Sequence, residues 1–221
     1  MQLRLLLVAL AAALVVPASA GARIIEVGDV GAKFPPSCPA VPCQVVSRTT
    51  GYQTRVEAQR KLFVAPRDGR IVAWSVTLGT PRKRDRLFFE QNLGGPAKAG
   101  ITVLKPGTKN YGRVVAQSPQ QLLTPYFGRT VQFPLTTSLD IKAGYIVALT
   151  VPTWAPVLAL DGLTSVSGWR ASRPVKKCDD TRTQSAQTTI RSLAQYRCLY
   201  RTARLTYSAT LITTPVPPKR R

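Results

Sequence analysis

Alternating apolar and polar residues predict several short β-strands along this 221-residue chain. Residues 70–78 place Trp74 and other apolar side chains on one face, so Trp74 is expected in the core. In residues 203–211 the apolar side chains take the odd positions, which leaves Arg204 and three hydroxyl residues on a polar outer face. This pattern is typical of strands that are covered by protein on one side.

An apolar run over residues 144–151 predicts a central strand that is covered on both faces. Proline cannot donate to a sheet ladder, so Pro152 is expected to end this strand. Trp154 lies between Pro152 and Pro156, and we therefore expect it on a stiff loop.

Several further stretches have the residue pattern of short strands. They are residues 22–30, 45–48, 61–64, 87–90, 101–105, 113–117, 131–135, 157–160 and 168–172. The basic residues 81–86 predict a loop, and the polar residues 181–194 have helical or disordered character. About ten short strands without an amphipathic helix or a repeat predict an all-β fold, a single antiparallel β-sandwich or jelly-roll-like domain.

The ends of the chain differ from its middle. Residues 1–20 contain one cation, Arg4, an apolar run and a small-residue ending at Ala20, which predicts a secretory signal peptide. We expect cleavage near Ala20, a secreted or cell-envelope-associated protein, and no transmembrane segment. The expected organisation is a proline-rich arm over residues 21–44, the sandwich over 45–212, and a basic proline-rich tail over 213–221.

Four cysteines follow the predicted signal peptide, and their even number favours disulfides over metal binding or catalysis. Three pairings are possible. The spacing favours Cys38 with Cys43 and Cys178 with Cys198, so that two disulfides staple the fold. In the alternative pairing, Cys38 or Cys43 joins the arm to the C-terminal region.

The chain carries 31 basic and 10 acidic residues. A surface with this excess of positive charge suits three partners, namely nucleic acid, anionic lipid and an acidic cell-wall polymer. The alternative is that the arginines reflect genome composition and give only a solvated basic surface.

The strand sequences carry a resemblance to a known group of proteins. It rests on GRIVAWSV (69–76), ITVLKP (101–106), RVVAQS (113–118) and LDIKAGYIVAL (139–149). In this order they resemble the strands of secreted actinobacterial β-sandwich proteins of unassigned function. The resemblance spans about residues 61–151 and implies the fold and export, but no activity.

The chain contains no histidine, which excludes Ser-His and Cys-His catalysis and histidine-based metal sites. It also lacks the glycine-rich phosphate loops of nucleotide-binding proteins. We expect no cofactor and no bound metal. Asp179 and Asp180 offer oxygen ligands for calcium, but a solvated loop explains them more simply.

Two enzyme classes remain open as alternatives. A glycosidase needs two nearby carboxylates, for which Asp85 and Glu90 are the best pair by position. The simpler interpretation is that Asp85 neutralises nearby arginines and that Glu90 is solvated. A polysaccharide lyase could use a tyrosine base beside arginines, and the residues of these types are Tyr196, Arg197, Tyr200, Arg201 and Arg204.

Binding residues are predicted from tryptophans and cations. Trp154 and Trp169 could offer flat faces to sugar rings or bases, although filling the core is the commoner fate of such residues. The ligand-binding candidates are Trp154, Trp169, Arg170, Arg173 and Arg204. A basic patch is predicted from Arg82, Lys83, Arg84, Arg86, Lys176 and Lys177, with the tail cations Lys219, Arg220 and Arg221, provided that the fold brings these sets to one face.

Together these features favour a secreted, non-catalytic binding or envelope-associated module for an anionic glycan or cell-wall polymer. The alternatives are a histidine-free lyase or glycosidase, a nucleic-acid binder, and a structural protein without a specific ligand.

Overall fold

The structure, a computed structural model, describes residues 21–31, 34–174, 176–180 and 184–215. Over these residues the chain forms fifteen strands, one α-helix and two short 3-10 helices. All of the strand pairings are antiparallel. The predicted all-β antiparallel sandwich is confirmed. The predicted signal peptide and the tail beyond residue 215 lie outside the described residues.

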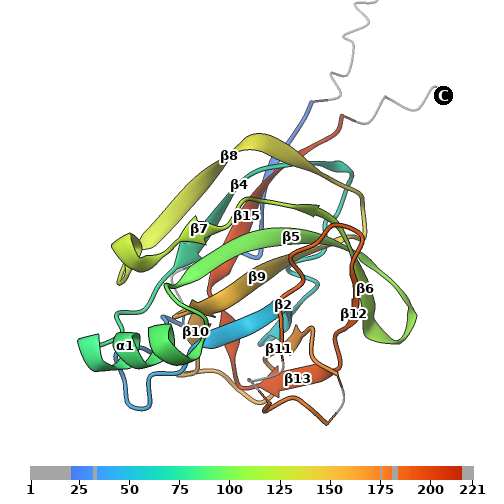
Figure 1. The fold of residues 1–221 in the computed structure, drawn as a ribbon. Coiled ribbons are helices and arrows are strands. Elements are labelled where there is room, and N and C mark those ends of the chain that lie inside the picture. Colours follow the sequence, from blue (N-terminus) through green and yellow to red (C-terminus); the bar gives the residue numbers. More distant parts are fainter. Residues whose placement is uncertain (1–20, 32–33, 175, 181–183, 216–221) are drawn as a thin grey trace, which may run out of the picture.

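The smaller sheet has four strands. In spatial order they are β1 (Ile24–Val27), β15 (Tyr207–Thr213), β4 (Gly69–Thr77) and β8 (Thr130–Ile141). β8 and β4 run along the top of the view in Figure 1. Because β1 comes from residues 21–44, the predicted arm contributes a strand that pairs with β15.

The larger sheet lies across the middle of Figure 1. Its order is β12 (Leu193–Gln195), β6 (Tyr111–Gln117), β5 (Lys98–Pro106), β9 (Ile146–Ala155), β2 (Val46–Val56), β11 (Gly168–Ala171) and β13 (Cys198–Arg201). Two short strands extend this sheet, β3 (Gln59–Arg60) on β2 and β7 (Gln121–Leu122) on β5. Separately, β10 (Leu158–Ala159) pairs with β14 (Arg204–Leu205) in a small two-stranded sheet. Residues 61–64 form no strand, and only Val64 makes a single bridge, to Ile146.

The core fills the space between the two sheets. Trp74 on β4 is fully buried, as predicted, and its ring lies 4.8 Å from that of Phe133 on β8. Tyr207 on β15 donates from its hydroxyl to the Val147 carbonyl of β9 at 2.9 Å, which joins the two sheets directly. Apolar residues of β5 and β9, among them Ile101 and Leu149, complete this core.

The outer face of the larger sheet is covered by the chain between residues 184 and 196. Gln187 donates from its backbone N–H to the Thr50 hydroxyl at 3.0 Å, and Tyr196 packs on Leu104 and Ala148. This segment was predicted to be helical or disordered. Instead it follows the sheet and ends in β12, because its backbone pairs with side chains that the sheet presents: the Gln187 N–H donates to the Thr50 hydroxyl, and the Gln187 carbonyl accepts from the Gln117 side-chain amide.

The predicted loop 81–86 and strand 87–90 are wrong, since these residues form α1 (Lys83–Asn92). Phe89 faces inward from this helix and lies 5.0 Å, ring to ring, from Trp154. In Figure 1 the helix projects from one end of the sandwich.

β9 does not end at Pro152 but continues to Ala155. The register with β2 shifts at this point, because Thr49 pairs with Val151 and Ser47 with Trp154. Two residues of β9, Pro152 and Thr153, therefore lie opposite one residue of β2, which defines a β-bulge. A bulge accepts proline within a strand because the ladder does not need the missing N–H there.

The two disulfides are Cys38–Cys43 and Cys178–Cys198, the pairing that the spacing favoured. Their presence is compatible with an oxidising, extracellular compartment. Over the described residues, α1 and the 3-10 helices are all too short or too polar to cross a bilayer.

Candidate functional site

Trp154 is buried and cannot offer a ring face to a ligand. Its indole N–H donates to the Gly95 carbonyl at 3.0 Å, and its ring lies between those of Phe89 and Phe127. The prediction of an exposed loop tryptophan is wrong because the β-bulge carries β9 past Pro152 into the core.

Trp169 on β11 is also buried, and both faces of its ring are covered. Tyr200 of β13 stacks on one face at 4.6 Å between ring centroids. On the other, a Cβ added to Gly51 would lie only 2.7 Å from the Trp169 ring, so glycine is required there. The buried indole N–H of Trp169 has no acceptor among the described residues. Trp169 therefore offers no free ring face on which a ligand could stack.

Arg173 is 6% exposed and lies beside the same aromatic pair. Its two terminal nitrogens donate to the Cys178 carbonyl at 2.9 Å, the Ser47 carbonyl at 2.8 Å and the Tyr200 hydroxyl at 2.6 Å. The Nε–H of Arg173 is buried and has no acceptor within the described ranges. No ion pair joins Arg173 to a carboxylate in the part of the chain that the structure describes. This cation is thus held by neutral oxygens alone.

Trp169 and Arg173 line one cavity of about 190 Å³, which we call the Trp169–Arg173 cavity. Its other walls come from β2, β10, β13 and the residues around them. The members that matter here are Val46, Leu158, Trp169, Arg173, Tyr200 and Arg201. Arg201 is exposed, whereas the aliphatic walls are buried. The cavity therefore combines apolar walls, two residues that each carry a buried N–H without an acceptor among the described residues, and a second cation that reaches solvent.

The other predicted binding residues lie elsewhere. Arg170 points to the opposite face of β11, where it donates to the Tyr196 carbonyl at 3.0 Å. Arg204 was predicted on an outer polar face but is 6% exposed. It lines a separate cleft of about 300 Å³ with Asp29 and Thr77. Burial lowers the pKa of Arg204 to about 10, while the charge of Asp29 acts in the opposite direction.

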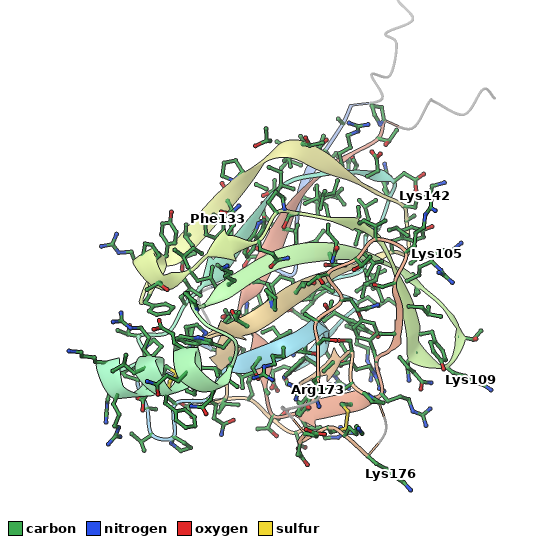
Figure 2. The ribbon with its side chains drawn as sticks, viewed as in Figure 1. Lys105, Lys109, Phe133, Lys142, Arg173 and Lys176 are labelled. Atoms are coloured by element: carbon green, nitrogen blue, oxygen red, sulfur yellow. A yellow bond between two sulfur atoms is a disulfide. The ribbon has the colours of Figure 1, made fainter. Side chains whose placement is uncertain are left out.

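The two predicted basic sets do not form one patch. Arg82, Lys83, Arg84 and Arg86 belong to α1 or its start, on the left in Figure 1, whereas Lys176 lies at the lower right in Figure 2. Arg173, three residues before Lys176 in the sequence, is buried. The tail cations lie outside the described residues.

The glycosidase pair is not assembled as predicted. Asp85 and Glu90 lie five positions apart on α1 and so face different directions. Each is near an arginine of the same helix, Arg84 at 3.8 Å from Asp85 and Arg86 at 3.9 Å from Glu90. This arrangement agrees with the simpler interpretation, charge neutralisation on the helix.

The tyrosines of the lyase alternative are also poorly placed for proton abstraction. Burial raises the pKa of Tyr200 and raises that of Tyr196 well above the usual range, which keeps both hydroxyls protonated at neutral pH and so unable to accept a proton as a base. Tyr196 lies on the outer side of the larger sheet and Tyr200 faces the core. Within the described residues no three acidic or cysteine side chains gather into a group that could hold a metal ion.

Sequence reasoning identified Trp169 and Arg173 but not the residues that hold them. Tyr200 was considered only as a base, and the carbonyls of Ser47 and Cys178 carry no sequence signal. One signal was available: the Cys178–Cys198 disulfide places residue 200 beside residues 173–178, and thus Tyr200 within reach of Arg173.

The chemistry of the Trp169–Arg173 cavity suits an acceptor group rather than a donor. Two of its lining residues, Arg173 and Trp169, carry a guanidinium and an indole N–H, groups that donate to anionic oxygens. No family model matches the chain, and comparisons with curated proteins and with solved structures found no significant similarity.

Proposed function

We propose that this protein is a secreted, non-catalytic binding module for an anionic glycan or cell-wall polymer, and that it holds a carboxylate of this ligand in the Trp169–Arg173 cavity. The observation that carries the proposal is that Trp169 and Arg173, each with a buried N–H donor that has no acceptor among the described residues, line the same cavity.

A carboxylate would satisfy both features of the cavity at once. A buried donor without a partner costs about 1–3 kcal/mol, so its presence next to a cavity favours a ligand that accepts hydrogen bonds. A buried cation is also costly unless an anion offsets its charge, and Arg173 has no carboxylate partner within the described chain. Arg201 adds positive charge where the ligand would enter.

Several observations favour a glycan over a nucleic acid. Proteins that bind single strands stack bases on exposed aromatic faces along a basic groove. Here the faces of Trp169 are covered by Tyr200 and Gly51, and the basic sets lie on different parts of the surface. A cavity of about 190 Å³ suits one small group of a polymer rather than a stretch of its backbone.

The first test compares two polymers that differ only in charge, polygalacturonate and its fully methyl-esterified form. We expect the disulfide-intact protein to bind the acid form and to lose binding when the carboxylates are esterified. Trp169→Phe removes the indole N–H but keeps a ring on Tyr200, and it should weaken binding about tenfold, since hydrogen bonds to charged groups contribute about 1.5–3 kcal/mol.

The matched control is Trp74→Phe, because the Trp74 N–H is also buried without an acceptor among the described residues but does not line the cavity. A second pair compares Arg201→Gln with Arg197→Gln, two exposed arginines near β13 of which only Arg201 lines the cavity. Equal effects within either pair would contradict the proposal. So would uniform binding to all polyanions that disappears in high salt, which is expected if net charge is the whole cause.

A further inference from the structure

α1 presents an apolar and basic face to solvent. None of its residues is fully buried, and Leu87 and Phe88 are 45% and 58% exposed. A helix turns 100° per residue, so Lys83, Arg84, Leu87 and Phe88 lie on one side, away from Phe89 and its contact with Trp154. An aromatic ring with this exposure on a projecting helix is unusual, because burial of such a ring is favourable.

A second apolar group projects beside this helix. Val41, at the tip of the Cys38–Cys43 loop, is 71% exposed. The loop is fixed to the chain just before α1, since the Thr80 N–H donates to the Cys38 carbonyl and a Cβ on Gly79 would lie 2.9 Å from that of Cys38. Figure 1 shows the loop, drawn in blue, next to α1 at the same end of the sandwich.

The charge of this end is positive. Arg82, Lys83 and Arg84 are exposed, and Arg86 is partly exposed, while only Asp85 and Glu90 carry negative charge on the helix. We propose that the outer face of α1 and the tip of the Cys38–Cys43 loop bind an anionic lipid surface. This contact surface, the α1 edge, consists of Val41, Arg82, Lys83, Arg84, Leu87 and Phe88.

The chemistry of the α1 edge selects a membrane rather than a soluble polyanion. Glycans and nucleic acid backbones are hydrated and give Val41, Leu87 and Phe88 no apolar layer to enter. A bilayer interface offers both partners, acyl chains for the apolar side chains and anionic headgroups for the cations. The surface is also separate from the Trp169–Arg173 cavity, so the inference does not depend on the proposed function.

The test is binding of the purified protein to vesicles of phosphatidylcholine with and without phosphatidylglycerol. Because the whole protein is basic, charge alone gives some binding, and the decisive variants keep the charge unchanged. We expect Leu87→Ser with Phe88→Ser to weaken binding to the anionic vesicles about tenfold. The control, Leu122→Ser with Leu193→Ser, changes two leucines of similar exposure, 46% and 53%, on other elements and should leave binding unchanged.

A second pair of variants tests the position of the charges, because both variants lose the same two units of positive charge. Lys83→Gln with Arg84→Gln should weaken binding more than Lys109→Gln with Lys142→Gln, which lie on the opposite side of the molecule (Figure 2). Trp169→Phe should have no effect on vesicle binding, which separates this surface from the cavity.

Insertion is measured with Phe88→Trp and vesicles that carry brominated acyl chains. The native tryptophans are at most 4% exposed, so the new indole is the one that a bromine atom can reach. Quenching of Phe88→Trp on bound protein supports the inference. Bound protein without quenching, or an equal effect of both serine pairs, would overturn it.

Discussion

Replacing Thr150 by valine tests a ladder of hydroxyl groups that crosses the larger sheet. Thr150 on β9 is fully buried, and its hydroxyl lies 3.0 Å from that of Thr50 on β2 and 2.5 Å from that of Thr102 on β5. The Thr50 and Thr102 hydroxyls also accept hydrogen bonds: the Gln187 backbone N–H donates to Thr50, and the Gln117 side-chain amide donates to Thr102, each at 3.0 Å. The ladder thus joins three strands to the segment that covers them.

The expected cost follows from counting the groups that lose partners. Valine has nearly the same shape as threonine, so the substitution leaves almost no cavity. Thr150 has one hydroxyl proton, so it donates to at most one of these neighbours and accepts from at least one, and the substitution leaves at least one neighbouring hydroxyl as a buried donor without this acceptor. Such a donor costs about 1–3 kcal/mol, and we expect Thr150→Val to lower the free energy of unfolding by about 2 kcal/mol.

The assay is urea unfolding with both disulfides intact, where the midpoint shift at constant slope gives the change in stability. Thr150→Ser keeps the hydroxyl and loses one methyl group, for which about 1 kcal/mol is expected. Thr136→Val, at an exposed position of β8, should change stability by less than about 0.5 kcal/mol. If Thr150→Ser proves more damaging than Thr150→Val, packing rather than the hydroxyl ladder stabilises this face.

Three further results are expected. Hydrogen bonds from the backbone and hydroxyl of Thr164 lower the pKa of Glu57. The contribution of the Glu57 carboxylate to stability is therefore present at neutral pH and is lost as the pH falls through that lowered pKa. In acid unfolding, Glu57→Gln should make stability depend less on pH in this range. Burial raises the pKa of Tyr207 well above its usual range, so stability should fall above about pH 10 by about 1.4 kcal/mol per pH unit for this group. Tyr207→Phe should reduce the slope of stability against pH. Tyr111→Phe, at an exposed position, should leave that slope unchanged. Replacing Cys178 and Cys198 by serine opens a loop with a sequence separation of 20 and should cost about 3 kcal/mol in urea unfolding, and a cost near zero would contradict the loop-entropy argument.

The strands were predictable where the chain alternates regularly, because a buried face imposes a period of two on its own residues. β4 and β5 are within three residues of their expected bounds, and Trp74 lies in the core as predicted. α1 was missed because Leu87 to Glu90 has the composition of a strand. Its signals were the inward pair Phe89 and Leu93, four residues apart, and the glycines that follow.

The failures at Pro152 and Arg204 have another cause, since both depend on partners far away in the sequence. The bulge that accepts Pro152 is defined against Ser47 and Thr49, about a hundred residues earlier. Arg204 is buried because the ladder breaks at Thr206, whose N–H bonds to the Val157 carbonyl, so β14 pairs with β10 rather than continuing into β15. The residues next to Pro152 and those next to Arg204 therefore contain no signal for these distant partners.

A structural role alone does not account for the Trp169–Arg173 cavity. The terminal nitrogens of Arg173 tie β2 to the disulfide-bonded segment, and this role would be complete with Ser47, Cys178 and Tyr200 as its acceptors. It leaves the Arg173 Nε–H and the Trp169 N–H unexplained. A buried donor without an acceptor is not a site in itself, because the Trp74 N–H is in the same state within the core. What distinguishes Trp169 is that it lines a cavity together with a buried cation, Arg173, and an exposed arginine, Arg201. The comparison of Trp169→Phe with Trp74→Phe therefore separates the cost of losing a buried N–H, which both variants share, from the loss of ligand contact, which only Trp169→Phe should show.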